Sequence, residues 1–305
     1  MAEPLRTVLR PRLPVSLGPT LRTLRHGPRD PSVRIRDAEA WLTLRTVTGP
    51  ATVHLHARNG EIHVASWGPG RGEALDVAPA LVGARDDLTG WEPRRLHAVA
   101  ELDRLNPGVR FVATGQVLAT AVPTVLEQKV QSREAHEAWL RMMFSWGEAA
   151  PGPEGGPQLR LRPAPRRLAA ERYPAYHRFG IERRRAEVVR GLADRHQRAE
   201  EAAALGTAGG RARLEAFAGV GGWTSAKVAA VAWADADAVA VGDYHLPEIV
   251  VYALTGRRGG DDDAMLELLE PFRPHRGRAA RLLKMSGLGP PRRAPRARLR
   301  DFRAS

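Results

Sequence analysis

Residues 214–247 read LEAFAGVGGWTSAKVAAVAWADADAVAVGDYHLP, and this stretch carries most of the information about the architecture. A glycine-rich turn at 219–222 separates two segments with helical patterns. Leu214 and Phe217 give the first segment an apolar side, and the second, near 224–233, is almost wholly small and apolar, which indicates a buried helix. Because glycine allows a sharp turn and a close approach to another backbone, we expect two helices joined by a tight hairpin.

The start of the second helix has the properties of a phosphate-binding site. Thr224 can cap this helix with its hydroxyl group, and the unpaired N–H groups of the first turn then point outward, where they attract anions. We therefore expect phosphate contacts from five residues of the hairpin: Gly219, Val220, Gly221, Gly222 and Thr224.

A lone carboxylate, Asp243, follows Trp223 by twenty residues and precedes Tyr244. It lies in a short polar break between apolar runs, which suits a side chain that a loop places in an active site. It also suits the N-cap of a helix that starts near His245, because Pro247 then lies in the first turn. The two roles are compatible, and both are kept as expectations.

Four segments together resemble a known family. GVGGWT (219–224) followed by VGDYHLP (241–247) resembles the hairpin and catalytic-aspartate signature of the helix-hairpin-helix DNA glycosylase superfamily, closest to its alkylbase (3-methyladenine) glycosylase II branch. VLEQKV (125–130) is similar to the minor-groove helix of that branch, and LEPFRPHRGRAARLL (269–283) to its Pro-Trp-Arg-Pro-type helix start. The resemblance covers about 106 to 290 and rests on the order and spacing of these segments.

The resemblance implies an enzyme that removes a damaged, alkylated base from duplex DNA, the first step of base-excision repair. Asp243 would be its catalytic residue, because an ionised carboxylate stabilises the positive charge that develops on the deoxyribose. The nucleotide must leave the base stack for C1′ to become accessible. Trp223 stands where bifunctional relatives carry an imine-forming lysine, which implies hydrolysis without lyase activity.

The same resemblance implies that no organic cofactor is required. It implies a monovalent cation held against a DNA phosphate by carbonyl groups of the hairpin backbone. No side-chain metal site is expected, since 261–263 (Asp-Asp-Asp) reads as a helix N-terminus without further ligands. A rival interpretation is a non-catalytic DNA-binding protein that keeps this fold for lesion sensing.

Only three of the 47 basic residues are lysines, and all three fall at positions that matter for the resemblance. Lys227 lies one helical turn after Trp223, where it could pair with Asp243 and lower its pKa, or extend to the solvent as a surface residue. Lys284 replaces a pocket tryptophan of the branch, and Lys129 an apolar wedge. Fixed cations in the pocket would disfavour a cationic base such as 3-methyladenine.

The site expected from the sequence therefore has two parts. The base pocket comprises Trp223, Lys227, Tyr244 and Lys284. The DNA contacts comprise the hairpin together with Gln128, Lys129 and Arg276, where Gln128 either donates to the base opposite the lesion or is an exposed helix residue.

Composition supports a nucleic-acid partner. The 305 residues are 43% apolar, enough for one large or two ordinary domains, and carry a net charge of +13 with a pI of about 11.2. The absence of cysteine excludes disulfides, iron–sulfur clusters and thiolate zinc sites. With no long apolar run or signal-peptide core, we expect a cytoplasmic monomer away from membranes, and the arginine bias suggests a GC-rich bacterial genome.

The expected fold class is α+β. Residues 1–30, rich in proline and arginine, read as an extended basic arm, and 31–105 as a small antiparallel β domain with short helices. Residues 106–290 read as an all-α helix-hairpin-helix domain, with a surface loop at 149–165. The tail 291–305 reads as disordered and basic. A hairpin is expected around Asn59-Gly60, and helices near 166–170, 182–204, 211–218, 245–254, 263–269 and 274–285.

Overall fold

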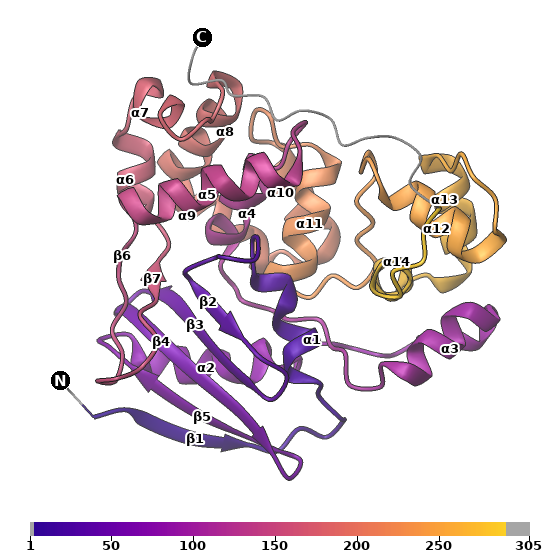
Figure 1. The fold of residues 1–305 in the computed structure, drawn as a ribbon, viewed down its shortest axis with the longest axis horizontal. Coiled ribbons are helices and arrows are strands. Elements are labelled where there is room, and N and C mark those ends of the chain that lie inside the picture. Colours follow the sequence, from indigo (N-terminus) through magenta and orange to yellow (C-terminus); the bar gives the residue numbers. More distant parts are fainter. Residues whose placement is uncertain (1–2, 291–305) are drawn as a thin grey trace.

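The computed structural model describes residues 3–290, so the expected basic tail at 291–305 lies outside the described part of the chain. An N-terminal antiparallel sheet is followed by two groups of helices, which confirms the α+β class (Figure 1). The sheet has the strand order β1-β5-β4-β3-β2. Its strands are β1 (Leu5–Leu9), β2 (Val33–Ile35), β3 (Glu39–Thr46), β4 (Gly49–Arg58) and β5 (Glu61–Trp67).

The turn between β4 and β5 confirms the hairpin expected from the sequence. Asn59 and Gly60 both have positive φ angles, 52° and 77°, as a two-residue type I′ turn requires. The register Arg58↔Glu61 follows directly from this turn. The alternation of β4 then places Val53 and Leu55 on the inner face of the sheet.

The expectation of an extended arm at 1–30 is wrong. β1 pairs with β5 from Leu5↔Ser66 to Leu9↔Ile62 and forms an edge of the sheet. After it, α1 (Leu17–Leu21) and η1 (Arg22–Leu24) bury three leucines against the same core: Leu17, Leu21 and Leu24. The high arginine and proline content concealed a short strand, because a strand on a sheet edge needs an apolar residue only at alternate positions.

One face of the sheet is covered by a helix and the other is not. α2 (Arg71–Leu81) lies behind the sheet in Figure 1 and packs Ala74, Ala78 and Leu81 against β4 and β5. The opposite face is turned toward the viewer, and no helix crosses it in Figure 1. The side chains on the face covered by α2 therefore form the core of this region.

The first helical group surrounds one large apolar core that includes Trp139 and Tyr176. Its elements are α4 (Val117–Leu126), α5 (Ser132–Trp146), α6 (Pro165–Ala170), α7 (Tyr173–His177), α8 (Arg183–Asp194), α9 (His196–Glu200), η3 (Glu201–Ala204), α10 (Gly206–Glu215) and α11 (Gly222–Ala232). The sequence did not predict α7. At the edges of the expected loop at 149–165, the strands β6 (Glu148–Ala149) and β7 (Arg160–Leu161) pair with each other.

The second helical group corrects the expected domain boundary at residue 105. It contains η2 (Pro93–Arg95), α3 (His97–Leu105), α12 (Leu246–Thr255), α13 (Asp262–Leu269), η4 (Glu270–Phe272) and α14 (Arg276–Met285). Val99 of α3 is fully buried in one core with Phe272 and Leu283, so α3 packs with helices from the far end of the chain. Sequence proximity placed α3 with the sheet, whereas its apolar side is buried against α14.

Candidate active site

The hairpin between α10 and α11 has the expected form. Gly219 has a φ of +82°, and a Cβ atom there would lie 2.2 Å from Cγ2 of Val188, so glycine is required by both backbone and space. A Cβ atom on Gly221 or Gly222 would meet nothing within 4 Å. The first turn of α11 therefore presents an exposed backbone surface to a ligand.

The predicted role of Thr224 as helix cap is wrong, whereas a phosphate contact through its backbone N–H stays a prediction. The helix begins two residues earlier than expected, and its N-cap is Gly221, which has no side chain to occupy the first amides. Thr224 is 2% exposed, and its hydroxyl accepts a hydrogen bond of 2.9 Å from Nε2 of Gln128. The amides at the start of α11 thus remain without a side-chain cap.

Asp243 is held at two places by different parts of the chain. Its Oδ2 accepts a hydrogen bond of 3.0 Å from the indole Nε1 of Trp223 on α11. Its Oδ1 accepts from the backbone N–H groups of His245 and Leu246, both at 3.0 Å, where α12 begins. The N-cap residue of α12 is His245 and not Asp243 as expected, but the side chain of Asp243 accepts from the amides at this helix start, and these bonds fix the carboxylate between the two helices.

These contacts keep Asp243 ionised. Burial opposes the charged form, but the indole N–H of Trp223, the backbone N–H groups of His245 and Leu246 and the charge of Lys284 together lower the pKa of Asp243 below its ordinary value. Lys284 therefore acts on Asp243 through its charge, from the exposed end of α14. The expectation that Lys227 supplies this charge is wrong.

Lys227 instead forms an ion pair with Glu127, which follows α4. Its Nζ lies 4.5 Å from the ring centroid of Trp223, on the face of the indole whose edge donates to Asp243. Burial opposes the charge of Glu127, but His26, whose Nδ1 lies 3.7 Å away, and Lys227 lower its pKa to about 2. The ionised Glu127 compensates Lys227, so this lysine is not an isolated cation beside the site.

The turn at 127–130 joins the site to the hairpin. Gln128 donates from Nε2 to the carbonyl oxygen of Gly219 at 3.0 Å as well as to Thr224. These contacts of Gln128 fix the hairpin, and its predicted contact with the base opposite the lesion stays a prediction. Lys129, the next residue, is exposed and has a φ of 55°, an uncommon backbone conformation for a non-glycine residue.

The remaining predicted residues divide into exposed and internal positions. The side chain of Tyr244 is 90% exposed beside Asp243 and is available to a ligand. The prediction that Arg276 contacts DNA is wrong. Its side chain is only 14% exposed and pairs with Asp237 through Nε (3.0 Å) and Nη2 (2.6 Å). This bidentate pair stabilises the start of α14 and leaves the guanidinium turned into the protein.

Sequence reasoning missed Asp262 as a positioning residue. Its two carboxylate oxygens accept from the N–H of Gly242 at 3.1 and 2.9 Å, and so hold the residue before Asp243. Asp261 caps α13 by accepting from the N–H of Ala264 at 2.9 Å, which agrees with the expected helix N-terminus. The acidic run was the available signal, but only folding brings α13 against the loop of Asp243.

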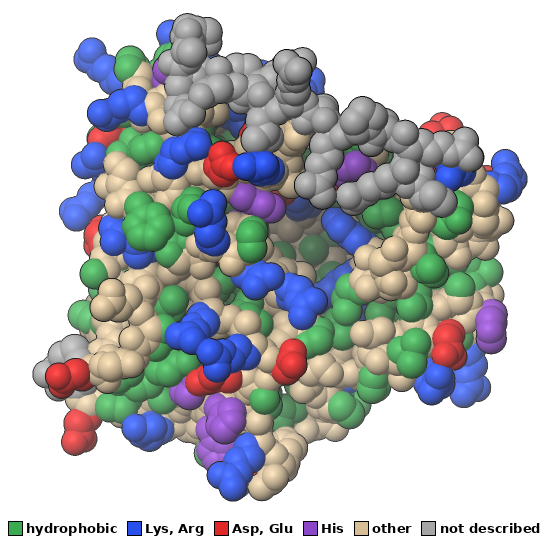
Figure 2. All heavy atoms as spheres, viewed as in Figure 1, with side chains coloured by type: hydrophobic (Ala, Val, Ile, Leu, Met, Phe, Trp, Pro, Cys, Tyr) green, Lys and Arg blue, Asp and Glu red, His purple; other side chains and the backbone are tan. Residues whose placement is uncertain are grey.

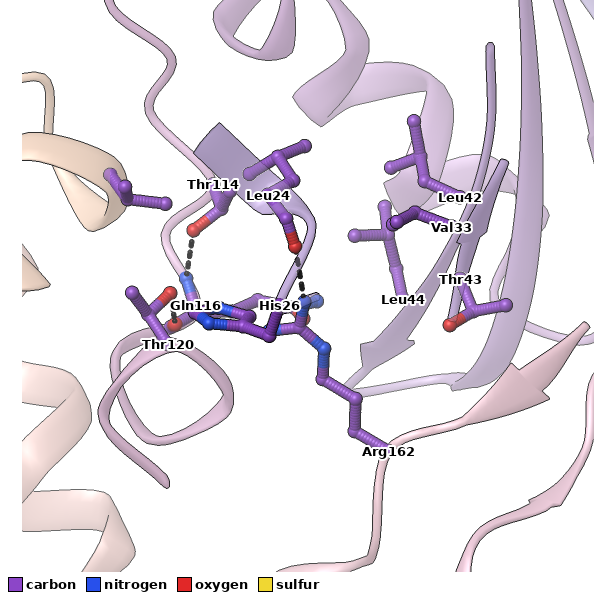
Figure 3. A pocket seen from close by; sticks show the side chains of 11 residues that line it. Leu24, His26, Val33, Leu42, Thr43, Leu44, Thr114, Gln116, Thr120 and Arg162 are labelled. Atoms are coloured by element: carbon purple, nitrogen blue, oxygen red, sulfur yellow. Dashed lines mark hydrogen bonds between the residues drawn. The ribbon is translucent and has the colours of Figure 1, made fainter. Parts of the chain in front are cut away.

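Figure 2 shows a hollow between α11 and the α12–α14 group, with lysine and arginine side chains at its rim. A separate small cavity lies between the sheet and α4 (Figure 3). Leu42 and Leu44 line that cavity from β3 and Thr120 from α4, while Arg162 donates across its side to the carbonyl of Leu24 at 2.9 Å. None of the predicted site residues lines it, so it is unrelated to Asp243.

The described residues bear on metal binding and membrane insertion. Across residues 3–290, no group of three or more histidine, aspartate or glutamate side chains is arranged to hold a metal ion. In the same residues, no helix has both the length and the apolar character needed to cross a bilayer.

Comparison with known proteins identifies the fold. No protein-family model matches the chain, and no curated protein matches it in sequence. Among solved structures, that of MBOgg1 in complex with a low-affinity DNA ligand has a TM-score of 0.71 at 15% identity, covering 93% of this chain and 96% of that one. A 3-methyladenine DNA glycosylase from Archaeoglobus fulgidus has a TM-score of 0.71 at 14% identity, covering 91% and 97%.

An 8-oxoguanine glycosylase/lyase from Clostridium acetobutylicum, in complex with double-stranded DNA, is a third similar structure. Its TM-score is 0.60 at 11% identity, with 84% of this chain and 98% of that one covered. The protein therefore has the fold of the helix-hairpin-helix DNA glycosylases. Because these structures include glycosylases named for different bases, the fold does not choose the substrate.

Proposed function

We propose that the protein is a DNA repair glycosylase that hydrolyses the N-glycosidic bond of an alkylated base in duplex DNA. The observation that carries this proposal is the position of Asp243. An ionised, partly buried carboxylate is hydrogen-bonded to Trp223 in the first turn of α11, the helix that follows the glycine hairpin. Such a carboxylate can stabilise positive charge on a deoxyribose that the hairpin brings close by binding a nearby phosphate.

In the proposed reaction the hairpin amides bind the DNA backbone and the damaged nucleotide rotates out of the stack. Asp243 faces the developing oxocarbenium ion, and a water molecule adds to C1′ while the base departs. Trp223 cannot form an imine, and Lys227 is engaged as a cation by Glu127. Both features support a monofunctional reaction without strand cleavage.

The pairing of Lys227 also bears on the substrate. A lysine that is compensated by an ionised carboxylate repels a positively charged base less than an isolated lysine would. Alkylated bases, including cationic ones, therefore remain the proposed substrates, although the sequence alone predicted that cationic bases would be disfavoured. A monovalent cation at the hairpin stays a prediction. One of the hairpin carbonyl groups that could bind it, that of Gly219, also accepts a hydrogen bond from Gln128.

The rival proposal is a DNA-binding protein without catalytic activity that recognises lesions. The exposed Lys129, where an apolar wedge was expected, favours it, since a charged side chain replaces base stacking poorly. It predicts duplex binding, with a preference for damaged DNA, but no released base.

A panel of duplexes with one lesion each separates the two proposals. The panel should include 3-methyladenine, 7-methylguanine, hypoxanthine and 8-oxoguanine, with base release followed in single turnover and Asp243→Asn as the inactive control. Release of an alkylated base without strand cleavage or borohydride trapping is the expected result. Release of 8-oxoguanine alone, or trapping that disappears in Lys227→Ala, would assign a different specificity or a lyase reaction.

A further inference from the structure

The face of the N-terminal sheet that no helix covers carries an ordered row of side chains. The β7 segment lies against one end of this face, where the carbonyl oxygen of Arg160 accepts from Oγ1 of Thr43 at 3.1 Å. The strand register places Arg6 beside Ala65, Ala65 beside His54, His54 beside Trp41 and Trp41 beside Arg34, one residue from each of the five strands. With neighbouring strands about 4.8 Å apart, the row is about 19 Å long. We call this set of five residues the cross-strand row. It begins and ends with an arginine and has aromatic rings at its centre.

The rings of this face form a stacked and rigid group. Trp41 stacks on His54 with centroids 4.0 Å apart and on Trp67 at 5.3 Å. Glu39 fixes the pair, since its Oε1 accepts from Nε1 of Trp41 at 3.2 Å and lies 2.9 Å from Nε2 of His54. His56 extends the group, with its ring parallel to that of His54 at 6.4 Å. An aromatic group held in this way loses little conformational entropy when a ligand binds.

The rim of the same face is open. His56 and His63 lie opposite each other in the register of β4 and β5, and both are exposed. Burial lowers the pKa of His54, so its ring is neutral at pH 7 and can act as an uncharged stacking surface. Solvent faces of antiparallel sheets are ordinarily polar, so a run of tryptophan and histidine rings is a departure from that pattern.

The charge of this face is positive and only partly compensated. The two carboxylates near the row are already engaged: Glu39 with Trp41 and His54, and Glu61 with Arg10 at 2.8 Å. Within residues 3–290, Arg6 and Arg34 are exposed and form no ion pair. Figure 2 shows blue and purple side chains gathered over the lower part of this face, where β3, β4 and β5 lie.

We propose that this sheet face binds single-stranded nucleic acid at a site separate from the hairpin. The bases contact the rings of Trp41, His54, His56 and His63, and the arginines at the ends of the row bind phosphates. Aromatic rings flanked by cations are the combination that holds single strands without sequence preference, since every base has a π-face. The proposal does not depend on catalysis at Asp243.

The test uses the full chain carrying Gly221→Asp, which is expected to weaken the hairpin site, and a fluorescein-labelled dT12 oligonucleotide. The double variant Arg6→Glu/Arg34→Glu should weaken dT12 binding at least tenfold. The matched control is Arg104→Glu/Arg183→Glu, which makes the same change of charge at arginines with 68% exposed side chains on α3 and α8. This control should change the affinity less than threefold.

Two competitors test the role of the rings. An abasic dodecamer, which keeps the phosphates but lacks bases, should compete at least fivefold more weakly than unlabelled dT12. Polyglutamate, which stands for an acidic protein, should compete more weakly still. The variant His56→Ala/His63→Ala should remove part of the difference between dT12 and the abasic strand, and thermal melting should show that each variant is folded.

Several results would overturn the proposal. They are the absence of dT12 binding, an equal loss in the control variant, equal competition by the abasic strand, and more effective competition by polyglutamate. The last result would indicate a surface for an acidic protein. Loss of glycosylase activity in any lesion assay would leave the sheet site unaffected, so the two proposals can fail separately.

Discussion

The two helices that border the candidate active site begin in opposite ways. α11 begins with two glycines, and no side chain caps its first turn. α12 begins with its first amides bonded to Oδ1 of Asp243. One helix start therefore remains open to an anion from outside, while the other uses its amides to fix the protein's own carboxylate. The proposed DNA binding therefore belongs to the start of α11, and the proposed chemistry to the start of α12.

The largest effect is expected when the carboxylate at α12 loses its charge. Asp243→Asn keeps an oxygen that can accept from the α12 amides, so the variant should fold. Base release in single turnover should fall roughly 10³-fold, because a charge that stabilises the transition state is lost, while duplex affinity should change little. Near-normal release by a folded variant would reduce Asp243 to a helix cap.

The second effect concerns the ion pair that links α11 to the turn at 127–130. In the folded protein the pKa of Glu127 lies at about 2, below the ordinary value of 4.5. The ionised Glu127 therefore contributes about 3 kcal/mol to the free energy of unfolding. This contribution is fully present above pH 4.5 and is lost as the pH falls toward 2. Glu127→Gln should therefore be markedly less stable to urea at pH 7, with a smaller further loss in acid.

The matched control for this measurement is Glu154→Gln, which changes an exposed carboxylate in the loop between β6 and β7. Its free energy of unfolding should follow the wild type at each pH. If Glu127→Gln behaves in the same way as this control, the pair with Lys227 does not stabilise α11.

At the open helix start, Gly221→Asp should weaken binding of undamaged duplex roughly tenfold. The site has room for the side chain, and aspartate is a good N-cap, so the variant should be at least as stable as the wild type. The carboxylate would then occupy the amides that bind phosphate and repel the DNA. Fluorescence anisotropy at several salt concentrations measures this, and unchanged affinity would place the hairpin outside the DNA interface.

A smaller effect tests the connection between the two helix starts. Trp223→Phe removes the indole N–H that lowers the pKa of Asp243 but keeps an aromatic ring beneath Lys227. The pKa of Asp243 should rise, so the acidic limb of the pH–rate profile should move to higher pH by about one unit. A general fall in rate at every pH, with no displacement of the limb, would assign Trp223 to packing alone.

The smallest effect is expected at the exposed tip of the 127–130 turn. Lys129→Met should weaken duplex binding severalfold and reduce the salt dependence by about one phosphate contact. Arg133→Met, at a side chain that is 71% exposed and paired with Glu137, is the control. Equal slopes in both variants would show that Lys129 does not contact a phosphate.

The sequence by itself determined the class of fold, the glycine hairpin before α11 and the position of Asp243 next to the start of α12. These features depend on neighbours along the chain: glycines that permit a turn, apolar periodicity, and a carboxylate next to the start of a helix. The β4–β5 hairpin was predictable for the same local reason. The helical character of the interior segments was predictable from their apolar patterns, but their bounds were not. The helix expected at 182–204 is divided into α8, α9 and η3, and the helix expected at 211–218 runs from Gly206 to Glu215.

Only the tertiary structure decided which charges meet. Lys227 was expected near Asp243, but it pairs with Glu127, one hundred residues earlier in the chain. Arg276 turns inward to Asp237, and Asp262 reaches the loop of Asp243. A long charged side chain takes the partner that packing brings within reach, and no local pattern encodes that choice. For the same reason β1 and α3 were misplaced, since their partners lie far away in sequence.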